Sequence, residues 1–248
     1  MYNYDTLTQE KLKELALNSP KWLVRAEATK MIDDQETLKQ IALSDSDYDV
    51  RSEAVKKLVD QETLKHIALH DGRWKVRLAG TKKLIDQDAI KHIALNDRDD
   101  NVRCEATKKL IDQETLKHIA LHDRYCLARQ DATKKLDDQD TLKHIALNDK
   151  HEGVLLEAVK KLDDQEILMY LVLSGSSYAV RFFVAKKLDL QKALKLIALY
   201  SNAPSEKCQA IKELTDQETL KEIVLNGDNR AVRDAAQTRL EVLTSTVK

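Results

Sequence analysis

Hydrophobic and polar positions along the chain repeat with a period of 26 residues. Two copies, Asp60–Asp71 and Asp112–Asp123, share the string DQETLKHIALHD letter for letter. Related segments begin near residues 8, 34, 86, 138, 164, 190 and 216, with no insertion between successive starts. A fixed period of this length is typical of stacked-repeat proteins, in which each repeat contacts its neighbours. The pattern predicts nine repeats in one array over residues 1–248.

Each repeat contains two short stretches with helical spacing. In the repeat that begins at Asp34, the first stripe includes Ile41 and Ala42, and the second starts at Val50 and recurs every four residues. Asp34 and Asp47 precede these stretches as N-caps, because a carboxylate accepts the free N–H groups of the first helical turn. Helices of about three turns are too short to persist alone in water. We therefore expect each helix pair to bury its stripes against neighbouring pairs.

Composition agrees with a helical chain. Five Gly and two Pro among 248 residues argue against a sandwich, a barrel or disorder. The ends of a repeat array need polar covers. We expect Met1–Asn18 to form an irregular first unit and Asp234–Lys248 to cover the other end.

Charge and hydropathy limit the binding partners and the cellular compartment that we expect. The 41 basic residues nearly cancel the 42 acidic ones, so no net field favours nucleic acid or an anionic membrane. No stretch approaches the roughly 18 apolar residues that a membrane span needs, and the N-terminus lacks the pattern of a signal peptide. Three cysteines without CxxC spacing favour free thiols in a reducing compartment. We expect a cytoplasmic protein without membrane contact.

The second half of each repeat carries a recognisable motif. It reads VRSEAVKKLVD at Val50–Asp60 and VRCEATKKLID at Val102–Asp112, and Val-Arg also stands at 24/25, 76/77, 180/181 and 232/233. Over its whole length the chain resembles the HEAT-like repeat superfamily, in a short-period form with armadillo-like stacking and some likeness to leucine-rich repeat variants. The resemblance implies an all-α fold, a right-handed α-solenoid of nine two-helix repeats. It also implies a role as an interaction scaffold, without naming a partner.

In HEAT-like families the motif Arg commonly bonds an Asp of the inter-helix turn and builds a ladder between repeats. The resemblance implies such a ladder from Arg51, Arg77 and Arg103 with Asp45, Asp71 and Asp97. The motif is incomplete toward the C-terminus, where the departures are Leu155 for Arg, Gly175 and Gly227 for Asp, and Ser201 with Lys207 in the eighth repeat. We expect less uniform stacking in that third of the chain.

The histidines suggest a metal site at first sight. Four share one repeat position, and two i,i+4 pairs have a spacing that can bind zinc: His66 with His70, and His118 with His122. Helical counting points His66 away from the core stripe, and no third ligand is apparent. Histidines in neighbouring repeats would lie about a helix diameter apart, too far to share one ion. The prediction is solvated surface histidines at His66, His92, His118 and His144, with no metal.

Paired lysines run along the second helices and suggest nucleic-acid binding as an alternative function. They stand at 56/57, 82/83, 108/109, 134/135, 160/161 and 186/187. Acidic residues three or four positions earlier can pair with them on the same face, at Glu53, Glu105, Asp131 and Glu157. Among the six repeats with paired lysines, only the third and the seventh lack an acidic residue at this position, where they have Ala79 and Phe183. A salt-bridged, solvated face is the favoured interpretation.

Catalytic signals are weak. The chain has no Gly-rich phosphate loop, CxxC pair or nucleophile elbow, and the proximity of Cys126 to His122 in sequence is poor evidence for a nucleophile. His151-Glu152 is similar to the His-Glu pairs of HEAT-like deoxyhypusine hydroxylases, which use several such pairs to hold two irons; one pair does not suffice. We predict no catalysis and no cofactor.

Another alternative function is that of an auxiliary subunit of a modifying enzyme, as in HEAT-like bilin lyases.

The turn and the start of the second helix vary between repeats, whereas the stripes barely change. Apolar residues gather at this variable edge in repeats five to seven, at Tyr125, Leu127, Leu155, Leu156, Tyr178, Phe182 and Phe183. Exposed apolar groups that cluster together favour a partner surface, so these residues are predicted to bind another protein. Local repacking around Val184 is the alternative. An aromatic position just before Val-Arg is predicted to pack over the turn, at Trp22, Tyr48, Trp74 and Tyr178.

Overall fold

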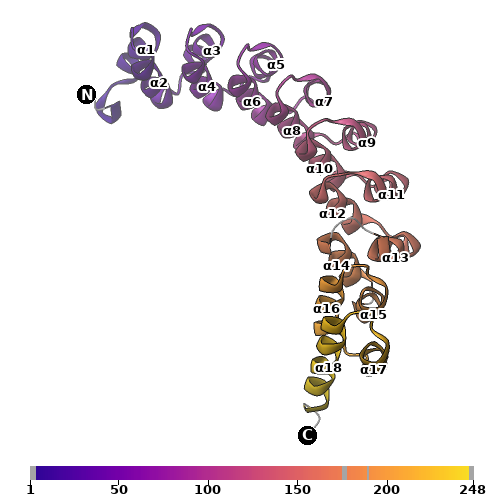
Figure 1. Ribbon diagram of the computed structural model, residues 1–248. Coiled ribbons are helices and arrows are strands. Elements are labelled where there is room, and N and C mark those ends of the chain that lie inside the picture. The colour runs from indigo at the N-terminus through magenta and orange to yellow at the C-terminus, as the bar shows by residue number, and fades with distance from the viewer. Residues whose placement is uncertain (1–3, 175–177, 189, 246–248) are drawn as a thin grey trace. The chain divides into compact units, whose positions relative to one another are not determined.

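The computed structural model describes residues 4–174, 178–188 and 190–245, and these are helical apart from short connections (Figure 1). Described elements comprise one 3-10 turn, η1 (Tyr4–Thr6), and eighteen α-helices that follow one another in pairs. The chain divides into two compact units, Met1–Lys135 and Leu136–Lys248. We call them the N-terminal and C-terminal units, and each is described by itself.

The N-terminal unit contains five helix pairs, one for each of the first five repeats. Their bounds are α1 (Gln9–Asn18), α2 (Trp22–Met31), α3 (Gln35–Ser44), α4 (Tyr48–Lys57), α5 (Gln61–His70), α6 (Trp74–Lys83), α7 (Gln87–Asn96), α8 (Asp100–Lys109), α9 (Gln113–His122) and α10 (Cys126–Lys135).

The C-terminal unit contains the helix pairs of the other four repeats. Their bounds are α11 (Gln139–Asn148), α12 (Glu152–Lys161), α13 (Gln165–Ser174), α14 (Tyr178–Lys187), α15 (Leu190–Tyr200), α16 (Pro204–Glu213), α17 (Gln217–Asn226) and α18 (Arg230–Ser245).

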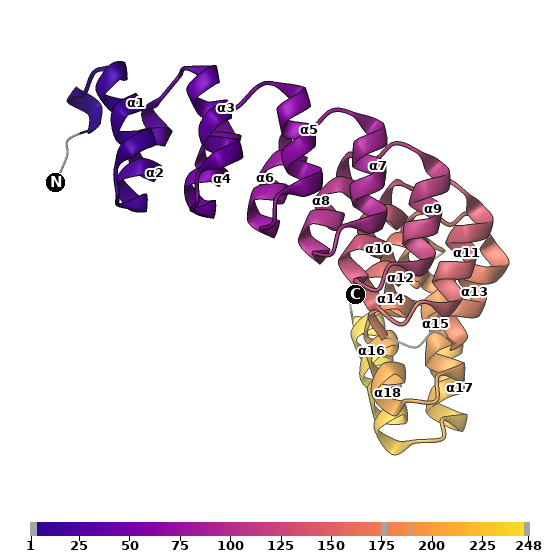
Figure 2. The ribbon, with the colours of Figure 1, turned by 90° about the horizontal axis from the view of Figure 1, so that it is seen from above.

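Within the N-terminal unit the helices form two layers. The odd-numbered helices lie in one layer and the even-numbered helices in the other, as the two ribbon views show (Figures 1 and 2). Even-numbered helices contact one another more extensively than odd-numbered helices do, and they line the inner side of this unit's curve (Figure 1). Consecutive helix pairs also pack on one another within the C-terminal unit. The predicted all-α solenoid of two-helix repeats is confirmed in the arrangement of these helices.

The predicted aspartate caps mark the starts of α3 and α4. The Asp34 carboxylate accepts hydrogen bonds from the backbone N–H of Thr37 at 3.0 Å and from the Thr37 hydroxyl at 2.5 Å. Asp47 caps α4 in the same way, by accepting from the backbone N–H of Asp49 at 2.9 Å. These bonds satisfy donors that the first helical turn leaves without intrahelical partners. The 10-residue helices α3 and α4 therefore begin at residues that the repeat pattern specifies, whereas α2, α6, α12 and α16 begin without a side-chain cap.

The apolar stripes form the core as the spacing predicts. Ile41 and Ala42 of α3 and Val50 of α4 are all buried, with exposures of 2% or less. A buried threonine follows the motif Arg in several repeats, and its hydroxyl needs a partner in this dry environment. The Thr81 hydroxyl donates to the carbonyl of Arg77 at 2.9 Å, and Thr107 does the same to Arg103. The polar atoms at these core positions are thus satisfied within their own helices.

Candidate interaction surfaces

The arginine ladder forms, but it connects different groups from those the resemblance implied. Arg51 donates from Nε and Nη2 to the Asp71 carboxylate at 2.8 and 3.0 Å, and from Nη1 to the backbone carbonyl of Asp45 at 2.8 Å. The carboxylate therefore belongs to the next repeat, whereas the Asp of the same repeat contributes its carbonyl. The same geometry links Arg25 to Asp45, Arg77 to Asp97 and Arg103 to Asp123.

This ladder is largely dry. The Arg77 and Asp97 side chains are each 6% exposed, so the ion pair lies between packed repeats rather than on the surface. Hydrogen bonding to Asp97 raises the pKa of Arg77, and burial opposes this shift without cancelling it. Bidentate pairing of this kind adds geometric specificity to the charge attraction. The ladder fixes the register of successive helix pairs.

The residues that depart from the ladder motif toward the C-terminus can be explained by the position of the partner Asp, which lies in the next repeat. Leu155 replaces the Arg of the sixth repeat, and the partner position in the next repeat is Gly175 in the sequence. Arg181 instead forms an ion pair with Glu206. Lys207 lies 3.0 Å from the carboxylate of Asp228, the residue beside Gly227. Donor and acceptor are both absent from the sequence at Leu155 and Gly175, whereas Arg181 and Lys207 each pair with a carboxylate from another position.

A second set of ion pairs joins the aspartate caps to the preceding repeat. The ammonium of Lys65 lies 2.6 Å from Asp86, and that of Lys13 lies 3.1 Å from Asp34. The Thr37 hydroxyl, the Thr37 backbone N–H and Lys13 together lower the pKa of Asp34 from 3.8 to about 2. Hydrogen bonding to Thr219 and then to Lys195 lowers the pKa of Asp216 to about 2. The folded state therefore favours the ionised form of these caps.

This shift predicts loss of stability in acid. Since the folded pKa of Asp34 and Asp216 lies below the ordinary value of 3.8, their contribution is present above that pH and disappears as the pH falls through about 2. The melting temperature, followed by circular dichroism, should fall over this interval. A D34N/D216N double variant should melt lower at neutral pH and show a shallower decline in acid. Identical acid profiles for both proteins would contradict the assignment.

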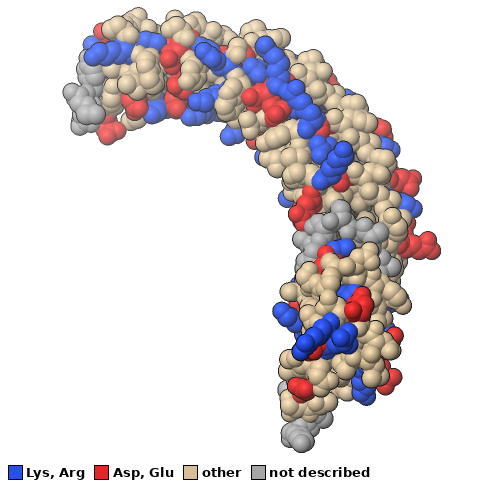
Figure 3. All heavy atoms as spheres, viewed as in Figure 1, with Lys and Arg blue, Asp and Glu red and all other residues tan. Residues whose placement is uncertain are grey.

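The paired lysines are mostly engaged within the protein. In the second and sixth repeats the first lysine meets the acidic residue of its own helix, as Lys56 does with Glu53 at 2.7 Å. The second donates to a backbone carbonyl at the end of the preceding even-numbered helix, as Lys83 does to Lys56 at 2.7 Å. Equivalent bonds run from Lys57 to Lys30, Lys109 to Lys82, Lys135 to Lys108 and Lys187 to Lys160. Figure 3 shows acidic groups beside the basic groups of the N-terminal unit. These contacts weaken the nucleic-acid alternative.

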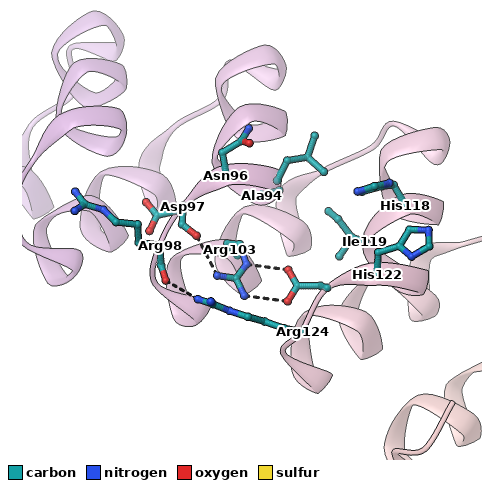
Figure 4. Close-up of a pocket in the computed structure, with 11 residues that line it drawn as sticks. Ala94, Asn96, Asp97, Arg98, Arg103, His118, Ile119, His122 and Arg124 are labelled. Atoms are coloured by element: carbon teal, nitrogen blue, oxygen red, sulfur yellow. Dashed lines mark hydrogen bonds and ion pairs between the residues drawn. The ribbon is translucent and has the colours of Figure 1, made fainter.

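A hollow of about 470 Å³ lies between α7, α8 and α9 at the turn edge (Figure 4). Arg98, Arg103, His118 and Arg124 are among the residues that line it. Arg103 is held by the ladder, and Arg124 donates to the backbone carbonyl of Arg98 at 3.0 Å. In Figure 4, Arg103 and Arg124 bind residues of the two turns. The hollow is best explained as the outer rim of the ladder.

The histidines occupy the surface, as predicted. His66, His92 and His118 are exposed, and the rings of His118 and His122 have centroids 5.0 Å apart. Within the described ranges, no group of three or more His, Cys, Asp or Glu side chains is arranged to hold a metal ion. His151 and Glu152 are exposed at the start of α12. No helix among the described residues is both long and apolar enough to cross a membrane.

One of the three cysteines is excluded as a nucleophile by its environment. Cys104 is buried on α8, and the loss of solvent raises the pKa of its thiol to about 12. Since the thiolate is the reactive species, this thiol is inert at neutral pH. Cys126 and Cys208 are half-buried.

The structure distributes the predicted partner-binding residues over both units. Leu127 is 45% exposed and Tyr125 is half-buried at the start of α10 in the N-terminal unit. Leu156 on α12 and Phe182 and Phe183 on α14 are half-buried in the C-terminal unit. Tyr178 begins α14, but its side chain lies outside the described residues.

Leu155 does not fit the predicted binding surface. Its side chain is only 5% exposed, so the expectation that it is an exposed apolar residue is wrong. The physical reason is its repeat position, which points into the ladder between helix pairs, where Arg77 and Arg103 are also buried. Within the C-terminal unit, Leu156, Phe182 and Phe183 remain as candidates.

A groove between α4 and α6 was not predicted. It measures about 470 Å³, and Trp74, Leu78 and Ala79 contribute its apolar lining on the α6 side. Trp74 is 38% exposed and Trp22 is 42% exposed, so more than half of each residue is covered and the rest of each faces solvent. The available sequence signal was Ala79, which breaks the acidic position of the second helix and leaves the neighbouring surface uncovered.

The solved structures to which this chain is similar share little sequence identity with it. No family model and no curated protein matches the chain. A crystal structure of YibA from Escherichia coli is 17% identical, with a TM-score of 0.48, over 96% of this chain and 94% of that chain. A designed armadillo repeat protein is 19% identical, with a TM-score of 0.19, over 95% of this chain and all of that chain. Neither similarity identifies an activity.

Proposed function

We propose that the chain is a non-catalytic, cytoplasmic protein-interaction scaffold of the HEAT-like type. The charged residues at repeated positions are used to join repeats, as Arg77, Lys65 and Lys83 illustrate. Residues that vary lie on the turn edge and on the exposed face of the even-numbered helices. A constant frame with one variable face is typical of repeat proteins that bind other proteins.

The observation that best supports binding is the pair of rings on α14. Phe182 and Phe183 stand at two repeat positions that hold Ser52 and Glu53 in the second repeat. Both rings are half-buried, so each retains surface that water can reach. Aromatic side chains at such sites supply large contact areas when a partner covers them. Tyr125 and Leu127 of the N-terminal unit are proposed as a further candidate surface, and Tyr178 stays a candidate from the sequence alone.

Replacing both rings with serine tests the proposal. The F182S/F183S variant should capture at least about tenfold less of the partner, since aromatic anchors carry much of the binding energy at an interface. Its melting temperature should change by less than about 4 °C, because half-exposed positions contribute modestly to stability. Capture from an extract of the source cells can be quantified by mass spectrometry, with melting followed by circular dichroism.

Tyr200→Ser is the matched control, because Tyr200 is a 66% exposed aromatic residue on the odd-numbered helix α15. This control should leave partner capture unchanged. If F182S/F183S retains full capture, the rings do not form the binding surface. If it instead melts much lower, the rings belong to the core and the local-repacking explanation is correct.

A further inference from the structure

We propose that the groove between α4 and α6 binds a short acidic peptide segment that inserts one apolar side chain. The groove lies on the exposed face of the even-numbered helices in the N-terminal unit and is separate from the rings on α14. The inference rests on the proposed scaffold function and supplies the chemical class of one partner.

The floor of the groove accounts for the apolar side chain. Trp74 lies about one turn before Leu78 and Ala79 on α6, and the exposed part of the Trp74 ring forms one wall. The small Ala79 replaces a carboxylate-bearing residue, since the equivalent position holds Glu53 on α4 and Glu105 on α8. A pocket with an apolar floor and polar groups at its margin is the usual form of a site that holds one anchoring side chain.

The lysines at the rim of the groove favour a peptide with acidic residues. Lys75 and Lys82 are exposed on α6, and Lys82 lacks the carboxylate that neutralises Lys56 in the preceding repeat. The Lys82 ammonium makes no ion pair or hydrogen bond within the part of the chain that the structure describes. Four lysines and two carboxylates line the groove. Complementary charge therefore favours a ligand that carries negative groups beside its apolar side chain.

A short peptide fits this surface better than a nucleic acid does. The basic excess is confined to the third repeat, because Glu53 and Glu105 occupy the neighbouring repeats at the position of Ala79. A phosphate backbone that followed the helices would meet these carboxylates on both sides. Lys83, the other lysine at this end of α6, is already bound to the carbonyl of Lys56. The charge pattern thus limits the ligand to a few residues.

The test uses the full chain and a fluorescein-labelled ten-residue peptide, in which a central Phe-Leu pair is flanked by glutamates. Fluorescence anisotropy should detect binding that weakens with salt. Ala79→Glu should reduce the affinity by at least about tenfold, because it fills the floor and neutralises Lys82. The variant should fold, since Glu occupies this position in the second and fourth repeats. Gln40→Glu adds the same charge to the odd-numbered helix α3 and should leave the affinity unchanged.

Several outcomes would overturn the proposal. The proposal fails if Ala79→Glu binds the acidic peptide as tightly as the unchanged protein does, or if Gln40→Glu loses as much affinity as Ala79→Glu. It also fails if a peptide with lysines in place of the glutamates binds equally well, or if the acidic peptide does not bind at low salt. Preferential binding of a thymidine oligonucleotide would assign the groove to nucleic acid instead. Partner capture that depends on Phe182 and Phe183 is measured separately, so the scaffold proposal survives a failure here. Loss of both results would reject both proposals.

Discussion

Replacement of Arg77 by leucine should lower the free energy of unfolding by about 3–5 kcal/mol, because it leaves a buried carboxylate without its cation. Asp97 is 6% exposed and receives both guanidinium bonds from Arg77. After the substitution its remaining hydrogen bond comes from the backbone N–H of Asp99 at 2.8 Å. Urea unfolding followed by circular dichroism measures the loss.

The double variant R77L/D97S shows how much of the lost stability comes from the unpaired Asp97 carboxylate and how much from the lost contacts of Arg77. The chain itself supplies the model, since Leu155 replaces the ladder arginine and Ser201 replaces the ladder aspartate in later repeats. The Ser201 hydroxyl accepts the bond from the backbone N–H of Ala203 at 3.2 Å, so serine can retain the turn. We expect the double variant to be more stable than R77L alone. A double variant that is less stable would show that the cost lies elsewhere.

Leu84→Ala should lower the free energy of unfolding by about 2–5 kcal/mol, because it opens a cavity in a closely packed core. Leu84 follows the last residue of α6 and is fully buried. In a stacked array each repeat is stabilised by its neighbours, so the defect also weakens the coupling between adjacent helix pairs. The unfolding transition should therefore broaden as well as shift.

Ile85→Ala is the matched control for this experiment. Ile85 is the next residue in the chain and is 70% exposed. The Ile85→Ala substitution therefore removes a similar apolar volume, but from the surface and not from the core. The control should change the free energy of unfolding by less than about 0.5 kcal/mol. Similar losses in both variants would mean that Leu84 has no special role in the packing.

Local features of the fold could be predicted from the sequence. The Asp34 cap and the stripe through Ile41 depend on residues within one helical turn or two, so spacing alone reveals them. The partner of Arg51 could not be found in this way, because Asp45 and Asp71 are chemically equivalent in the sequence. Only the stacking distance between helix pairs distinguishes them.

The candidate surfaces show the same division. The sequence signalled Phe182 and Phe183 because they break a repeated polar position, but it could not separate the buried Leu155 from the half-buried Leu156. These neighbours differ in burial because one points between helix pairs and the other points outward. The groove beside Trp74 depends on the separation between α4 and α6, to which the sequence contributes only the small residue Ala79.

The bonds from lysines to carbonyls give the array a polarity. Lys83 of α6 donates to the carbonyl of Lys56 at the end of α4. Lys109 of α8 donates in the same way to the carbonyl of Lys82 at the end of α6. Arg239 occupies the same role near the C-terminal end and donates to the carbonyl of Leu214 at 3.0 Å. A repeat that carries this lysine thus has one donor for its predecessor and one acceptor for its successor, whereas the eighth repeat has Glu213 at the position of the donor. Such a segment behaves as an interchangeable cassette, so tandem duplication of a whole repeat could lengthen the chain without breaking a single inter-repeat bond.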